Sequence, residues 1–89
     1  MVKGKLKAKQ QLPKWFRGEL YEEGDTVRNR FSGEKCKLNN IELSMYDFVM
    51  GCSMMTEQGS RDTQLITDLR KGLDWFRMNN AEAYMVLLD

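Results

Sequence analysis

The sequence contains no histidine, and this absence removes several kinds of catalytic and metal site at once. Without histidine there is no Ser–His or Cys–His pair to activate a nucleophile, and no imidazole ligand for a metal ion. The two cysteines, Cys36 and Cys52, are 16 residues apart and have no companions for a zinc site. The glycines match neither a phosphate-binding loop nor a dinucleotide-binding fingerprint. We therefore predict a protein that is not an enzyme and that holds no cofactor or metal.

Long apolar runs are missing as well. No stretch approaches the roughly 20 residues that a membrane-spanning helix needs, and the basic N-terminus lacks the apolar segment of a signal peptide. Two cysteines, without the dense spacing of small secreted proteins, favour a reducing compartment. We expect a soluble intracellular protein that does not contact a membrane.

Charge is unevenly distributed, although the net charge is only +1. Residues 1–18 contain six basic residues and no acid, whereas the remainder contains 8 basic and 13 acidic residues, a net charge of −5. The six basic residues are Lys3, Lys5, Lys7, Lys9, Lys14 and Arg17. We interpret residues 1–12 as a flexible basic arm, because they contain few large apolar side chains, and residues 13–89 as a single small domain.

This basic region has two possible roles. Its lysines and Arg17 can neutralise the phosphates of a nucleic acid, with Trp15 and Phe16 as a stacking platform. Alternatively, the arm is a solvated tail, and Trp15 and Phe16 belong to the core. The acidic remainder of the chain opposes nucleic-acid binding, because it repels phosphate at low salt.

Residues 18–38 have the pattern of a small antiparallel sheet. Gly24 and Gly33 mark turns between three short runs, at residues 19–22, 26–31 and 34–38. The expected inward side chains are Leu20, Val27, Phe31, Cys36 and Leu38. Three short strands are not stable alone, so we expect a helix to cover them.

The next segment predicts a long helix from Asn40 to about residue 56 or 57. Asparagine caps its start, and Gly59 is placed to end it in a left-handed conformation. Gly51 inside the helix costs about 1 kcal/mol relative to alanine, which suggests that another backbone passes close to it.

Two further helices follow. Ser60 or Asp62 is placed to cap the second helix, and Asn80 to cap a short third helix over residues 81–88. The predicted fold is therefore α+β, with a small two- to three-stranded antiparallel sheet packed on a three-helix unit.

The long helix carries two apolar stripes at helical spacing. The first stripe, which we predict to face the core, comprises Ile41, Met45, Phe48, Cys52 and Met55. The second comprises Leu43, Tyr46, Met50 and Met54. This second stripe is either further core or an interface with another copy or a partner protein, since methionine-rich surfaces adapt to partners. Between the stripes a narrow solvent-facing side is expected to hold Glu42, Ser44, Asp47 and Ser53.

Several short motifs resemble a group of small uncharacterised proteins from contractile-tailed phages of marine cyanobacteria. The motifs are Pro13, Trp15, Phe16 and Gly18; residues 31–34 (Phe-Ser-Gly-Glu); residues 43–48 with Gly51; residues 72–77; and residues 82–89. Arg30 stands where the phage pattern has a proline before Phe-Ser-Gly. The resemblance implies a viral origin and the host cytoplasm as the compartment, and it implies no activity.

Taken together, these patterns predict a small non-enzymatic interaction protein that binds itself or a host or phage protein. The alternative is a nucleic-acid-binding accessory protein that uses the basic arm.

Overall fold

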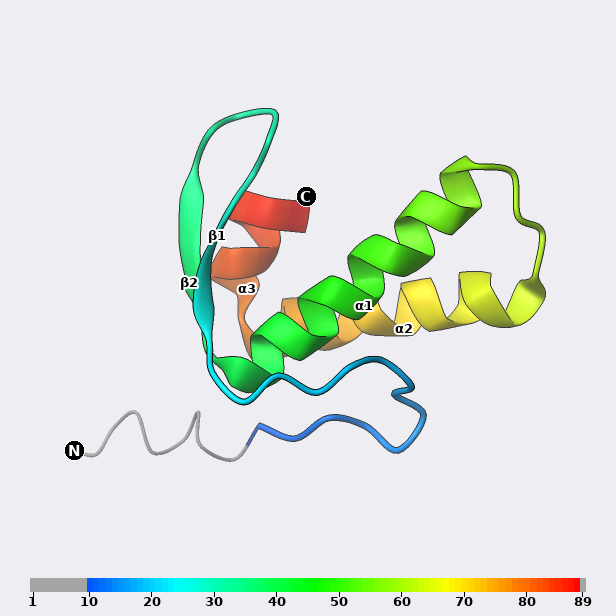
Figure 1. Ribbon diagram of the computed structural model, residues 1–89, viewed down its shortest axis with the longest axis horizontal. Coiled ribbons are helices and arrows are strands. Elements are labelled where there is room, and N and C mark those ends of the chain that lie inside the picture. Colours follow the sequence, from blue (N-terminus) through cyan, green and yellow to red (C-terminus); the bar gives the residue numbers. More distant parts are fainter. Residues whose placement is uncertain (1–9, 89) are drawn as a thin grey trace.

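The computed structural model describes residues 10–88, so Lys3, Lys5, Lys7 and Lys9 lie outside the described residues. Its elements are β1 (Asp25–Arg28), β2 (Lys35–Leu38), α1 (Asn40–Glu57), α2 (Thr63–Asn79), α3 (Ala81–Ala83) and a π-helical turn, η2 (Tyr84–Leu88). A hairpin of two antiparallel strands stands at one end of the α1–α2 pair, and α3 and η2 lie beside that hairpin (Figure 1). The α+β prediction is confirmed.

The sheet has two strands within residues 10–88, and the expected strand at residues 19–22 does not form. That stretch instead passes over α1, where the backbone N–H of Tyr21 donates to the Ser44 hydroxyl. In the hairpin, Val27 lies opposite Cys36 and Asp25 opposite Leu38. Of these, Leu38 is fully buried and joins the hairpin to the core.

Local caps set the helix ends, as predicted. The Asn39 side chain accepts from the backbone N–H of Glu42, and the Glu42 carboxylate accepts from the backbone N–H of Asn39, which completes a capping box. Asp62 caps α2, and Asn80 caps α3. Gly59 has a φ of +100°, a left-handed conformation that ends α1 and that glycine adopts without strain.

The buried side of α1 is rotated from the predicted stripe. Met45, Val49 and Cys52 are buried there, but Met55 of that stripe is exposed and Phe48 is half-buried. Val49 belonged to neither stripe. The direction from which α2 approaches decides this face, and helical spacing alone does not specify it.

Two polar residues expected on the solvent-facing side of α1, Glu42 and Ser44, are in fact buried. Each has hydrogen-bond partners in its buried position. Glu42 accepts from the amide groups of Gln10 and Asn80 as well as from the Asn39 backbone. The Ser44 hydroxyl donates to the Asn40 carbonyl oxygen. Buried polar groups are tolerated when they are paired in this way.

The close approach between helices occurs at Gly72 and not at Gly51. A Cβ at Gly72 would lie 2.5 Å from a Val49 methyl carbon, whereas a Cβ at Gly51 would meet nothing within 4 Å. The sequence-based expectation for Gly51 is therefore wrong. α2, and not α1, carries the glycine that the packing requires.

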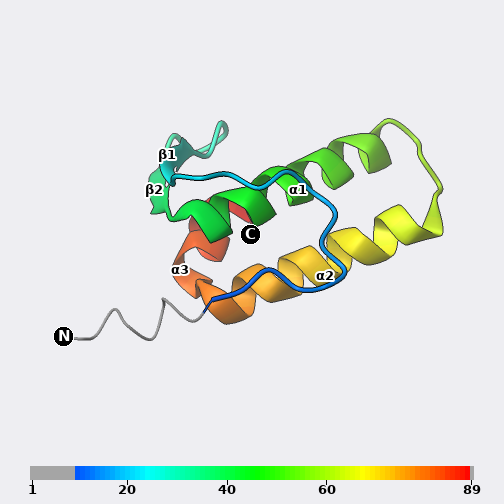
Figure 2. The same cartoon turned by 60° about the horizontal axis from the view of Figure 1, so that its bottom comes forward.

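Residues 10–17 form a strap across the α1–α2 pair, with one hydrogen-bonded turn from Pro13 to Phe16 (Figure 2). At the start of the strap, the Gln10 side chain donates to Glu42 and to the carbonyl oxygen of Asn79. Trp75 donates its ring N–H to the Gln11 carbonyl oxygen. Residues 10 and 11, which the sequence assigns to the basic arm, thus hydrogen-bond to both helices.

Candidate interaction groove

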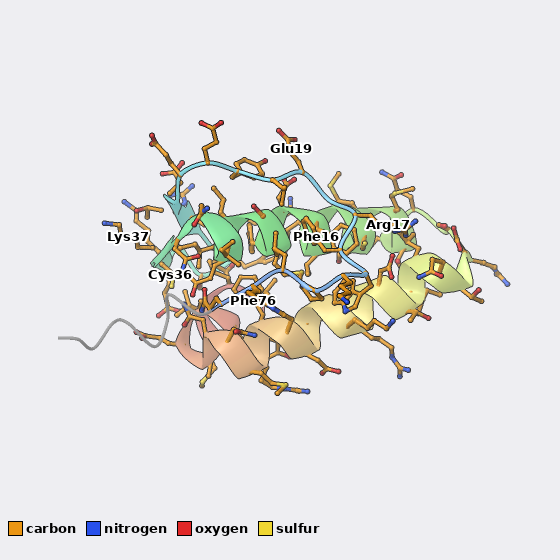
Figure 3. The ribbon with its side chains drawn as sticks, turned by 90° about the horizontal axis from the view of Figure 1, so that it is seen from below. Phe16, Arg17, Glu19, Cys36, Lys37 and Phe76 are labelled. Atoms are coloured by element: carbon orange, nitrogen blue, oxygen red, sulfur yellow. The ribbon has the colours of Figure 1, made fainter. Side chains whose placement is uncertain are left out.

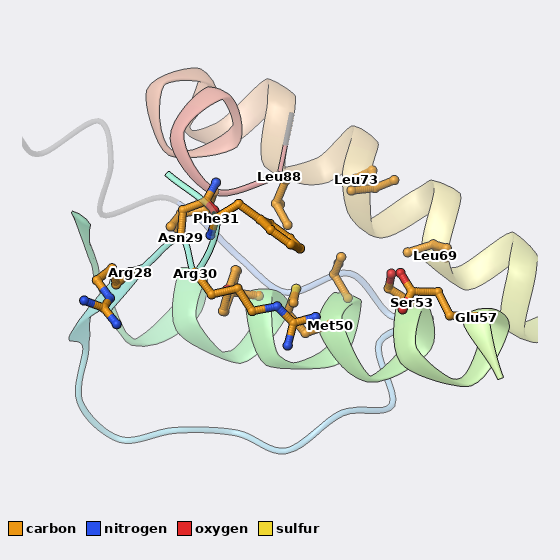
Figure 4. Close-up of a pocket in the computed structure, with 13 residues that line it drawn as sticks. Arg28, Asn29, Arg30, Phe31, Met50, Ser53, Glu57, Leu69, Leu73 and Leu88 are labelled. Atoms are coloured by element: carbon orange, nitrogen blue, oxygen red, sulfur yellow. The ribbon is translucent and has the colours of Figure 1, made fainter. Parts of the chain in front are cut away.

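The seam between α1 and α2 opposite the strap opens into a groove of about 290 Å³. Helix α1, helix α2, the end of η2 and the hairpin loop each contribute to its wall (Figure 4). The apolar wall consists of Phe31, Tyr46, Val49, Met50, Leu69, Leu73, Leu87 and Leu88. Concave apolar surfaces with a few polar groups at their edge are the usual form of binding sites.

The predicted interface stripe is divided by this geometry. Tyr46 and Met50 line the groove, whereas Leu43 is partly buried against the core. Met54 is 54% exposed and does not line the groove. The structure thus brings two of the four predicted residues together and adds side chains from three other parts of the chain.

Phe31 stands at the rim of the groove and is 88% exposed. It was expected to face inward, but strand β1 ends at Arg28, so the alternating pattern of a strand no longer applies at residue 31. The Asn29 side chain accepts from the backbone N–H groups of Phe31 and Ser32, and its amide donates to the Val86 carbonyl oxygen. These bonds hold the backbone of the loop against η2 and so place Phe31 beside the groove.

Opposite charges stand at the two ends of the groove. Arg28 and Arg30 lie at the hairpin end, and Glu57 lies at the far end, in the last turn of α1 (Figure 4). The Arg30 guanidinium carbon is 5.4 Å from the centre of the Phe31 ring. Burial raises the pKa of the Tyr46 hydroxyl above its ordinary value, and the charge of Arg30 partly opposes this rise.

The basic residues of the strap have different surroundings from those expected of a phosphate site. Arg17 pairs with Asp68, which is completely buried and also accepts from Gln64 at 2.8 Å. Burial by itself raises the pKa of Asp68, but the hydrogen bonds and charge of Arg17, with those of its other neighbours, hold this pKa below its ordinary value. Arg17 is thus engaged within the protein, while Lys14 is exposed.

Trp15 and Phe16 are half-buried and pack on the α1 side of the strap. Their ring centres lie 6.2 and 5.2 Å from that of Phe48. Figure 3 shows Phe16 and Arg17 where the strap crosses between the two helices. The Lys71 ammonium lies 5.7 Å from the centre of the Trp15 ring. Both rings therefore pack against α1 and keep part of their surface in contact with solvent.

The cysteines are both free, with Cys36 half-buried on β2 and Cys52 buried on α1. Burial raises the pKa of each thiol. Among residues 10–88, no cluster of three or more histidine, cysteine or acidic side chains is arranged to hold a metal ion. In the same part of the chain, no helix combines the length and apolar character required to cross a membrane.

Sequence reasoning missed the most exposed aromatic residue and four leucines of the groove. One local signal was available for Phe31: an asparagine two residues before it, followed by Ser32 and Gly33, is typical of a side-chain-stabilised turn. No comparable signal marks Leu69, Leu73, Leu87 or Leu88, because they meet only when α2 and η2 fold back onto α1.

Comparison of the chain with known protein families, curated proteins and solved structures found no match.

Proposed function

We propose that this chain is a non-enzymatic interaction protein of phage origin that acts in the host cytoplasm, and that the groove is its binding surface. The observation that supports the proposal is Phe31, a large apolar side chain held almost fully exposed beside an apolar groove. Burying such a ring contributes about 1.5–3 kcal/mol. Aromatic residues at the centre of a contact commonly supply much of the binding energy.

The partner that best fits the groove is a second copy of the chain. A two-fold axis brings the same surface of two copies together. The hairpin end of one groove then faces the end of the other groove that lies at the C-terminus of α1. In that arrangement Arg30 of each copy approaches Glu57 of the other, and both Phe31 rings leave water. The groove is small compared with stable interfaces, which bury about 1,600 Å² in total. We therefore expect weak, reversible dimers.

Light scattering over a wide range of protein concentrations tests this proposal. The expected result is a molecular mass that rises towards that of a dimer as concentration increases. Phe31→Ala should abolish the rise. Met78→Ala serves as the control, because Met78 is also a highly exposed apolar residue but lies outside the groove. A monomer at every concentration, or equal loss in both variants, would contradict self-association through the groove.

A charge exchange tests the arrangement of the two copies. Arg30→Glu and Glu57→Arg should each weaken the dimer, because each brings like charges together across the interface. The double variant carrying both changes should recover most of the association. If both single variants dimerise normally, the proposed reciprocal contact is wrong even when Phe31→Ala still acts.

A further inference from the structure

The solvent-facing side of α2 has a shallow hollow of about 450 Å³ that lies outside the groove's apolar wall except at Leu73. Its lining residues are Thr67, Arg70, Lys71, Leu73, Asp74, Arg77 and Tyr84. We call this surface the α2 outer face. Arg70, Lys71, Asp74 and Arg77 are all exposed, so three positive charges and one negative charge are presented to solvent.

The single acid of the α2 outer face is already paired. Asp74 accepts from the Arg77 guanidinium one turn away on the same helix. The other two cations, Arg70 and Lys71, form no ion pair among the described residues. Because α2 rises 1.5 Å per residue, Arg70 and Arg77 are separated by about 10 Å along the helix axis. The two guanidinium groups are therefore placed to meet different phosphates of one strand.

Aromatic rings border this basic surface on two sides. The Lys71 ammonium lies 5.7 Å from the centre of the Trp15 ring, and the Arg77 guanidinium carbon lies 5.8 Å from the centre of the Tyr84 ring. Basic side chains with neighbouring ring faces are typical of surfaces that bind nucleic acid without reading its sequence.

The acidic residues that follow the strap lie on another side of the molecule. Glu19, Glu22, Glu23 and Asp25 belong to the segment that passes over α1 and into β1. The acids of residues 19–25 thus lie along α1 and the hairpin, away from the basic side of α2.

We propose that the α2 outer face binds the phosphate backbone of nucleic acid. Arginine is suited to the role because its planar guanidinium group can donate two hydrogen bonds to one phosphate. The contact differs from the one expected from the sequence, because three residues of α2 take the place of Arg17. Arg17 is bound to the buried Asp68, whereas the pair of Arg77 with Asp74 is exposed on both sides and therefore weak. It does not depend on the groove, so either site can be disproved without the other.

Binding of labelled single-stranded and duplex oligonucleotides at about 50 and 200 mM salt tests the proposal. The main variant is Arg70→Gln with Lys71→Gln and Arg77→Gln. The matched control is Lys35→Gln with Lys37→Gln and Arg61→Gln, which removes three exposed cations from β2 and from the loop before α2. Both variants lower the net charge of the chain by 3, from +1 to −2. Any difference in affinity between the two variants therefore reports the position of the removed charges and not the total charge.

The full chain is expected to bind more weakly at the higher salt concentration. The α2 variant should lose roughly ten-fold or more in affinity, and the slope of log affinity against log salt should become shallower by about 2–3. The control should retain nearly all of its affinity. Asp74→Asn should strengthen binding several-fold, because it removes the one negative charge on the surface. Circular dichroism and thermal unfolding of each variant establish that the fold is retained.

Three results would overturn the proposal. The first is the absence of salt-sensitive binding by the full chain, and the second is equal loss of affinity in the α2 variant and the control. The third is a chain lacking residues 1–9 that no longer binds, combined with an α2 variant that binds normally, since the lysines alone would then account for the contact.

Discussion

The α1–α2 pair has two seams, one under the strap and one at the groove, and they are covered differently. On one side the strap covers the seam, with Trp15 and Phe16 packed on Phe48 and with Arg17 bound to buried Asp68. On the other side no segment among the described residues fills the seam, and Phe31 stands exposed beside it. Among residues 10–88, the strap covers one seam, whereas the other is left open between α1, α2, η2 and the hairpin loop. This difference locates the stabilising contacts on the strap side and the candidate binding surface on the groove side.

The largest effect on stability is expected at the seam that the strap covers. Phe48→Ala removes the ring on which the strap packs, and we expect it to lower the free energy of unfolding by about 2–3 kcal/mol. The value is below the range of about 3–5 kcal/mol for buried phenylalanine, because Phe48 is only half-buried. Urea denaturation followed by tryptophan fluorescence measures it. A loss below about 0.5 kcal/mol would mean that the strap contributes little to stability.

Gly72→Ala should separate the helices and so disturb both seams. The added methyl group would lie 2.5 Å from a Val49 methyl carbon, and such overpacking costs about 1–3 kcal/mol. The helix propensity of alanine offsets about 1 kcal/mol of this cost, so we expect a net loss of up to about 2 kcal/mol. Gly51→Ala is the matched control on the neighbouring helix, where the space is open. It should stabilise the protein by about 0.5–1 kcal/mol, because alanine favours the helix. Thermal unfolding of both variants checks the opposite signs.

Arg17→Gln should weaken the closed seam by about 1–2 kcal/mol, because it removes one partner from a buried carboxylate. The effect should depend on pH. The folded-state pKa of Asp68 is lowered, so its stabilisation is complete above the unfolded-state pKa of about 3.9 and is lost as pH falls through the lower folded-state value. The stability difference between wild type and variant should therefore be constant near neutral pH and shrink below about pH 4. A difference that is unchanged in acid would argue against the ion pair.

Phe31→Ala should have the smallest effect on stability, within about 0.5 kcal/mol, because the ring is already exposed in the folded chain. At the same time it should abolish the self-association proposed for the groove. Chemical denaturation of dilute protein, paired with light scattering of concentrated protein, separates these two quantities. A large loss of stability in dilute solution would instead assign Phe31 to the fold.

Local sequence determined the helices well. Asn39 with Glu42, Asp62 and Asn80 each supply a cap within a few residues of the helix they begin, and Gly59 ends α1 by its own conformational freedom. Such signals act within one turn of the chain, so they can be read without knowing the tertiary structure. The α+β fold class follows from the same local patterns.

Only the tertiary structure decided which surfaces are covered. Val49 is buried because α2 approaches it at Gly72, and Glu42 is buried because Gln10 and Asn80 arrive from distant parts of the chain to pair with it. The groove likewise exists because η2 and the hairpin loop meet beside α1. Helical spacing specifies which side chains share a face, but the burial of that face depends on its neighbours. For this reason only Tyr46 and Met50 of the second stripe line the candidate site, and its other apolar residues come from α2, η2 and the hairpin loop.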